Sequence, residues 1–120
     1  MALATVLYAK GKLSEKHLVP LSKHLSRWIA EQLNCDDEGG SLKADEVAVF
    51  FRENGPHDVT NGVDVLVHIV TDETPTRLAN GARILTVITN NVAGAIRIGL
   101  VVAVYAGKIG YVDNKPVASS

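Results

Sequence analysis

The feature that most constrains this chain is the order of its patterns, because strand, helix and strand occur in that order twice. Apolar runs and alternation predict strands, and apolar residues at helical spacing predict helices. The expected strands are residues 3–9, 47–52, 63–71 and 98–105, and the expected helices follow Ser14 and Thr74. Sliding the sequence by half of its 120 residues aligns Ser14 with Thr74 and Leu25 with Leu85. The pattern therefore predicts two βαβ halves of one architecture.

Composition limits the class of protein. A chain of 120 residues, 47% of them hydrophobic, suits one globular domain, which we expect at residues 1–112 with a polar tail at residues 113–120. The net charge of −1 provides no basic stripe for nucleic acid. Cys35 is the single cysteine, no signal peptide is recognisable, and the longest nearly apolar stretch is too short to cross a bilayer. We therefore expect a cytoplasmic protein with no membrane partner.

Each expected helix has an apolar stripe that should face the core. The first stripe consists of Leu18, Leu21, Leu25, Trp28, Ile29 and Leu33. The second consists of Leu78, Ala82, Leu85, Ile88 and Val92, and Gly94 is expected to follow the helix end. A proline inside a helix removes a backbone hydrogen bond. We therefore expect the first regular helix to begin near Val19, with Pro20 as its first residue.

One face of the expected sheet has no cover. Two right-handed βαβ crossovers place both helices on the same face of a four-stranded mixed sheet, in the α+β class. The other face contains Val, Leu, Phe and Tyr side chains, and such an exposed patch promotes aggregation unless it is covered. We therefore expect self-association through the sheet. Gly107 and Gly110 indicate a short hairpin, which we expect to pair with a neighbouring chain.

The first twelve residues and the order of the elements resemble the tautomerase superfamily, which includes 4-oxalocrotonate tautomerase and macrophage migration inhibitory factor. The segment from Ala2 to Lys12 is similar to that family's first strand and glycine-containing turn, with Lys12 at the family's arginine. The resemblance implies a homotrimer and a cofactor-independent keto–enol tautomerase. A ferredoxin-like βαββαβ fold has the same element order and remains an alternative, for which the strand order would be 4-1-3-2.

The resemblance also implies a catalytic residue, and here the chain departs from the family. The family's base is an N-terminal proline that removal of the initiating methionine exposes, whereas this chain has Ala2. Alanine is small enough for Met1 to be removed, which would leave a primary amine of ordinary pKa, about 7.7–8.0, that can accept a proton. If Met1 is retained, the amine lies one residue further out and this base is lost.

Four other residues are candidate substrate ligands. Lys12 and Arg52 lie at strand ends, where two cations could hold the carboxylate of a small keto acid. His68 alternates with apolar residues and could transfer a proton, and Tyr105 could donate to a developing enolate. The alternative is that the cations are only solvated and that the two rings only pack. No metal is expected, because His17 and His24 have no converging acid.

Three functions fit these observations. The first is a tautomerase or isomerase of small anionic carbonyl compounds that uses the amine of Ala2. The second is a non-catalytic tautomerase-like oligomer, whose pocket is vestigial or binds a ligand. The third is a ferredoxin-like regulatory or ligand-binding dimer. Removal or retention of Met1 separates the first from the second, and the strand order separates both from the third.

Overall fold

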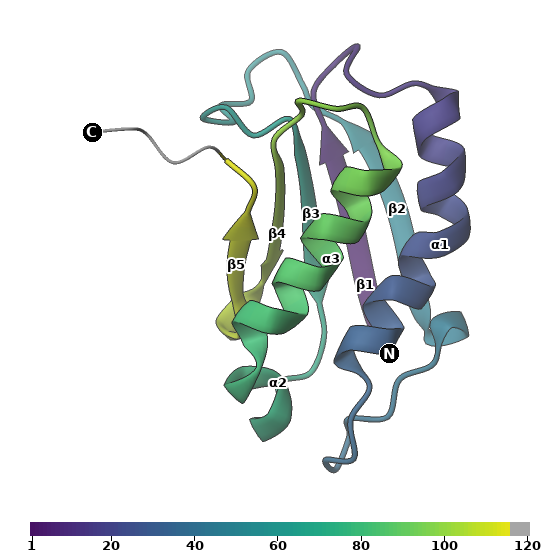
Figure 1. The fold of residues 1–120 in the computed structure, drawn as a ribbon, viewed down its shortest axis with the longest axis vertical. Coiled ribbons are helices and arrows are strands. Elements are labelled where there is room, and N and C mark those ends of the chain that lie inside the picture. Colours follow the sequence, from purple (N-terminus) through teal and green to yellow (C-terminus); the bar gives the residue numbers. More distant parts are fainter. Residues whose placement is uncertain (116–120) are drawn as a thin grey trace.

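The computed structural model describes residues 1–115, which form a sheet covered on one face by helices (Figure 1). The elements are β1 (Ala2–Tyr8), α1 (Glu15–Leu33), η1 (Ala44–Glu46), β2 (Val47–Glu53), β3 (Val65–Val70), α2 (Pro75–Ala79), α3 (Gly81–Ala95), β4 (Val102–Ala106), η2 (Gly107–Ile109) and β5 (Gly110–Asp113). The predicted polar tail began at residue 113, but Asp113 belongs to β5, and residues 116–120 lie outside the described part. No helix in that part is long and apolar enough to cross a membrane.

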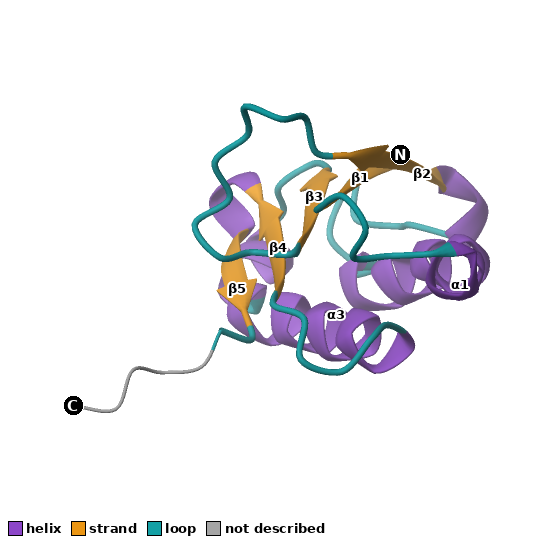
Figure 2. Ribbon diagram, turned by 90° about the horizontal axis from the view of Figure 1, so that it is seen from above, coloured by secondary structure: helices purple, strands orange, loops and turns teal. Residues whose placement is uncertain are grey.

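The sheet has five strands in the order β2-β1-β3-β4-β5. β1 is parallel to β2 and β3 is parallel to β4, whereas the two central strands, β1 and β3, are antiparallel. Figure 2 shows α1 and α3 on the same face of this sheet. The predicted pair of βαβ units is therefore confirmed. The ferredoxin-like alternative is wrong, because it requires the order 4-1-3-2.

The C-terminal hairpin completes the chain's own sheet. β5 pairs antiparallel with β4, with Ala103 opposite Asp113 and Ala106 opposite Gly110. The sheet therefore has a fifth strand beyond the four that were predicted, and the pairing of this hairpin with a neighbouring chain stays a prediction. Asn114 extends the pairing, since its backbone N–H donates to Val102 O at 3.0 Å.

The core lies between the sheet and the two long helices. Its largest fully buried aliphatic side chains are Val6, Val65, Val67 and Ile69 from the strands and Leu21, Leu25, Ile29, Leu33, Ile84, Leu85 and Ile88 from the helices. The first stripe is thus confirmed in its centre, but Leu18 and Trp28 are only partly buried at its edge. Removing the Trp28 side chain will therefore cost less than the ~3–5 kcal/mol of a fully buried aromatic.

Helix α1 begins earlier than expected. It starts at Glu15, so that Pro20 lies inside it. The first turn is closed before the proline, because Ser14 O accepts from the N–H of His17 and of Leu18 at 2.9 and 3.0 Å. Because Pro20 has no N–H, only the carbonyl of Lys16 lacks its helical hydrogen bond. Lys16 is exposed near the helix start, where water can replace that bond.

The second predicted helix is broken at Asn80 into α2 and α3. Gly81 begins α3 in a buried position, and a Cβ at this residue would overlap the carbonyl oxygen of Ile109. This close approach is available only to glycine and directs the helix across the sheet. The predicted stripe was therefore wrong before Ile84, because Leu78 and Ala82 are exposed. α3 also continues through Gly94 to Ala95.

The opposite face of the sheet is uncovered in the single chain, as expected. Strand alternation directs one set of side chains away from the helices. Several large apolar or aromatic side chains on this open face have more than a third of their surface exposed. They are Leu3, Phe50, Val70, Tyr105 and Tyr111. They come from all of the strands, so the exposed patch crosses the whole sheet.

Candidate functional site

The amino terminus lies at one end of a central strand. Ala2 is the first residue of β1 and pairs with Val47 of β2, and the next residue, Leu3, pairs with Val70 of β3. The Ala2 side chain is 2% exposed, whereas Met1 is 89% exposed. Removal of this one exposed residue would place an α-amine at the end of β1, between two flanking strands.

A buried arginine organises the segment beside this amino terminus. The segment is Thr71 and Asp72, which directly follows β3. Arg77, which is 2% exposed, donates from Nη1 to Asp72 O at 2.7 Å and to Thr71 Oγ1 at 3.3 Å. It also donates from Nε to Leu33 O at 2.8 Å and from Nη2 to Gly40 O at 3.0 Å. One guanidinium thus holds together the end of α1, the α1–β2 connection and the β3–α2 connection.

Sequence reasoning missed Arg77, although a signal was present. Arg77, Gly81, Leu85 and Ile88 follow helical spacing, and all are buried. The charge is stabilised by carbonyl oxygens, including one at the C-terminal end of α1, where the helix dipole favours a cation. The predicted stripe began at Leu78, one position after Arg77, and contained only apolar residues.

The α1–β2 connection is also attached to α2 through Asp37. Its carboxylate accepts from the Thr76 backbone N–H at 2.7 Å and from Thr76 Oγ1 at 2.9 Å. The hydrogen bonds from the backbone and then the side chain of Thr76 lower the pKa of Asp37 from its ordinary value. In the same place, Thr74 Oγ1 caps α2 by accepting from the N–H of Arg77 at 3.2 Å.

The lowered pKa of Asp37 predicts an acid-sensitive contribution to stability. The carboxylate stabilises the fold above the ordinary Asp pKa of about 3.9, and this contribution is lost as the pH falls through the lower folded value. We expect Asp37→Asn to lower Tm at pH 7 and to lose less Tm than the wild type between about pH 4 and pH 2. Asp36→Asn is the control, and differential scanning calorimetry measures all three. An equal fall in Tm between about pH 4 and pH 2 for the wild type and Asp37→Asn would contradict this role.

Lys12 and Arg52 lie at the opposite end of the sheet from Ala2. Arg52 is in register with Leu7, five residues along β1 from Ala2, or about 16 Å at ~3.3 Å per residue. Its guanidinium lies 5.7 Å from the centre of the Phe50 ring and donates to Phe51 O at 2.8 Å. Lys12 lies in the turn that follows β1. A single chain therefore does not bring these two cations to Ala2.

His68 and Tyr105, in contrast, lie side by side. They are in register on β3 and β4, and their ring centres are 5.2 Å apart at an interplanar angle of 30°. Both belong to the open face, and His68 is also in register with Thr5 on β1. Thr5 is three residues from Ala2, or about 10 Å. The pair thus occupies the middle of the sheet, between the amino terminus and the two cations.

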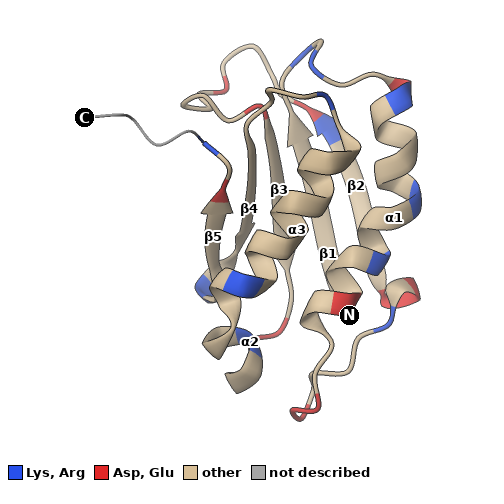
Figure 3. Ribbon diagram, viewed as in Figure 1, with Lys and Arg blue, Asp and Glu red and all other residues tan. Residues whose placement is uncertain are grey.

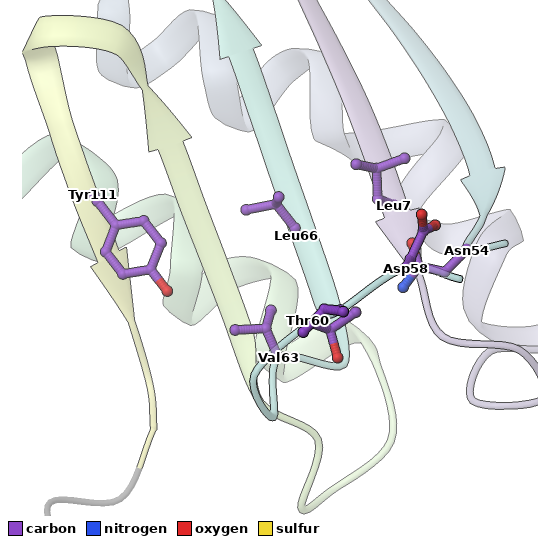
Figure 4. Close-up of a pocket in the computed structure, with 8 residues that line it drawn as sticks. Leu7, Asn54, Asp58, Thr60, Val63, Leu66 and Tyr111 are labelled. Atoms are coloured by element: carbon purple, nitrogen blue, oxygen red, sulfur yellow. The ribbon is translucent and has the colours of Figure 1, made fainter. Parts of the chain in front are cut away.

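A hollow of about 400 Å³ lies on the open face at the Lys12 end of the sheet (Figure 4). It is lined by Leu7, Asn54, Asp58, Val59, Thr60, Val63, Leu66 and Tyr111. A second hollow, of about 440 Å³, shares Asn54, Asp58 and Thr60 with it. None of the five predicted site residues lines either hollow. Within residues 1–115, no three His, Cys, Asp or Glu side chains are grouped to hold a metal ion.

In the ribbon of Figure 3, both the Lys or Arg colour and the Asp or Glu colour occur at each end of the molecule. The middle of the sheet is free of charge in that view. This distribution agrees with the absence of a basic stripe in the sequence.

Comparisons of sequence identify no relative, since no protein-family model and no curated protein matches the chain. Comparisons of structure find solved proteins with a similar fold. A symmetric trimer of wild-type fused 4-OT matches with a TM-score of 0.60 and 18% identity, over 87% of this chain and 82% of that one. MIF2 of Leishmania major matches with a TM-score of 0.57 and 15% identity, over 90% of each chain.

A third structure, N1 of the cis-3-chloroacrylic acid dehalogenase family, matches with a TM-score of 0.56 and 17% identity, over 87% of this chain and 72% of that one. These TM-scores show that the chain shares its fold with all three structures. The chain therefore has the fold of the tautomerase superfamily, as its first strand and element order predicted.

Proposed function

We propose that this chain is a self-assembling, cofactor-independent tautomerase or isomerase of a small anionic carbonyl compound, with the α-amine of Ala2 as its base. The observation that carries the proposal is the position of Ala2 at the start of a central strand, directly after the exposed Met1. In a tautomerase fold, this is the end of the chain at which the resemblance places the base.

The chemistry requires only a neutral amine. The amine takes the proton of an enol hydroxyl, and the resulting ammonium returns a proton to the substrate carbon, which yields the keto form. A carboxylate on the substrate needs a cation. Arg52 lies about 16 Å from Ala2 along β1, and Lys12 lies in the turn beyond the far end of that strand, so we propose that they serve the amine of a neighbouring copy.

Assembly is therefore part of the proposal, and the open face is its interface. Leu3, Phe50 and Val70 are exposed on this face, and burying such side chains is favourable by ~25 cal/mol per Å². A homotrimer is the proposed state, in keeping with the symmetric trimer formed by the fused 4-OT. His68 and Tyr105 would then face the interior of the assembly, where either ring can reach a substrate.

Turnover tests the proposal. The protein with Ala2 as its first residue is expected to convert the enol of a small aromatic or dicarboxylic pyruvate to the keto form, measured by ultraviolet absorbance. The rate should fall as the pH is lowered through the pKa of the amine, because only the neutral amine accepts a proton. Ala2→Pro should preserve or raise the rate, since it restores the secondary amine of the family. A rate that is flat from pH 5 to pH 9 would contradict the assignment.

Substitution of the two proposed carboxylate ligands should change substrate binding. Lys12→Ala and Arg52→Ala should each raise KM for the anionic substrate more than they lower kcat, because they remove binding and not chemistry. Lys23→Ala, an exposed lysine on α1, is the control and should leave KM unchanged. If the two substitutions raise KM equally for the anionic substrate and for its neutral ester, the two cations do not bind the substrate carboxylate.

The second candidate is a non-catalytic assembly of the same fold. The separation of Ala2 from both cations and from both hollows favours it. Intact mass separates the candidates, since retained Met1 favours the non-catalytic assembly and a mass lacking Met1 favours the enzyme. For either function we propose the cytoplasm as the compartment, where the free Cys35 would remain reduced.

A further inference from the structure

The registers of the four strand pairs place one residue from each strand in a single row across the open face. His68 on β3 is level with Thr5 on β1 and with Tyr105 on β4. The row continues to Phe50 on β2 and to Tyr111 on β5. His68 therefore lies at the centre of a row whose other members are three aromatic rings and one hydroxyl side chain.

The immediate neighbours of His68 on this face carry no charge. Tyr105, whose ring centre is 5.2 Å from that of His68, is the one titratable group among them. Helices α1 and α3 cover the other face of the sheet, so neither contributes a charge here (Figure 2). The other neighbours, along β3 and on the adjoining strands, are Leu3, Thr5, Leu7, Leu66, Val70 and Ala103.

Within the five strands, the charged residues of the open face are Arg52 and Asp113. Both are level with Leu66, two strands away on either side, or about 12 Å from His68 at ~4.8 Å between strands and ~3.3 Å per residue. Both are also engaged by groups of their own strands. Further charges lie beyond the ends of β3 and β4, at Asp64, Asp72 and Lys108. A protonated His68 would therefore have no adjacent carboxylate.

Protonation of His68 matters most when the open face is covered. In the single chain the side chain is partly exposed, so water can solvate an imidazolium. In the proposed assembly, other copies cover this face and remove that water. The Tyr105 ring would attract the cation, but this attraction is weaker than the cost of removing an unpaired charge from water. A symmetric trimer contains three copies of His68 in equivalent surroundings, so all three oppose assembly together.

We propose that His68 makes self-assembly depend on pH, so that the neutral imidazole permits the trimer and the protonated imidazole opposes it. This inference rests on the self-assembly included in the proposed function. Histidine side chains ordinarily titrate at about pH 6.5, so the trimer should be stable above that value and should weaken as the pH falls through it. At about fivefold for each histidine, the three together should raise the dissociation constant of the trimer by about 100-fold between pH 7.5 and pH 5.5.

Sedimentation velocity at pH 7.5 and pH 5.5 tests the proposal, and circular dichroism checks that the chain is folded at both values. At a concentration where the wild type is a trimer at pH 7.5, we expect it to dissociate at pH 5.5. His68→Gln keeps a polar side chain and His68→Phe fills the space of the ring, and neither can be protonated. We expect both variants to remain trimers at pH 5.5. His24→Gln, at an exposed position on α1, is the control and should dissociate like the wild type.

Three results would overturn the proposal. One is a wild-type dissociation constant that changes by less than about threefold between the two pH values. Another is dissociation of both His68 variants over the same pH range as the wild type, which would assign the effect to another group. The third is failure of both variants to assemble at pH 7.5, because a neutral side chain would then not be sufficient. A wild type that is trimeric at both pH values refutes this inference alone, whereas one that is monomeric at both refutes the proposed assembly as well.

Discussion

Arg77→Ala is expected to destabilise the fold by about 3–5 kcal/mol, the range for removing one member of a buried charged network. The alanine variant leaves the carbonyl oxygens of Leu33, Gly40 and Asp72 without the donor that joins them. Buried acceptors without donors cost free energy individually, and the cavity left by the side chain adds to this. Urea denaturation followed by circular dichroism measures the change in the free energy of unfolding.

Arg83→Ala is the matched control for this prediction. Arg83 is an exposed arginine on α3, and its removal should change stability by less than about 0.5 kcal/mol. Arg77→Lys should recover only part of the loss, because an ammonium group cannot reach the same spread of acceptors as a planar guanidinium. A cost below about 1 kcal/mol for Arg77→Ala would mean that the end of α1 and the two connections are held together by other contacts.

Lengthening the amino terminus by one residue is expected to lower turnover by at least about 100-fold, because general acid–base catalysis contributes about 10²–10⁴-fold. One added residue moves the amine by up to ~3.6 Å, which is enough to take it out of reach of a bound substrate. Two preparations make the comparison, one beginning at Ala2 and one with a glycine ahead of Ala2. Both are released from the same fusion partner, so that they are prepared in the same way.

Two controls accompany the comparison. Equal sedimentation and equal Tm for the two preparations would show that the added glycine leaves the fold and the assembly intact. Equal turnover would show that the amine has no chemical role, in which case the base is another group, such as His68, or the protein is not an enzyme.

The architecture was predictable because it depends on periodic patterns. Alternation in residues 47–52 identified β2 and the cap at Thr74 identified the start of α2, and the two-layer arrangement followed from the crossover rule. The break at Asn80 depends instead on contact between Gly81 and Ile109, which are far apart in the sequence. No local pattern contains such a contact.

The candidate site was less predictable than the fold. Alternation placed Arg52 and His68 on the correct face, but the parallel register of β1 and β2 separates Arg52 from Ala2. The hollow beside Asp58 is formed by a loop folding back over Leu66, and a loop conformation is not encoded by periodicity. The buried Arg77 shows the same limit, since its burial depends on carbonyl oxygens from the end of α1 and from two connections.

The central claim is that the open face of the sheet is covered by other copies of the chain, and sedimentation velocity tests it most directly. At micromolar concentration, the wild type should sediment as a species of roughly three times 12.8 kDa. Val70→Lys, on the open face, should sediment as a monomer, whereas Leu78→Lys, a similarly exposed residue on α2, should remain a trimer. A monomeric wild type, or equal behaviour of the two variants, would contradict the claim.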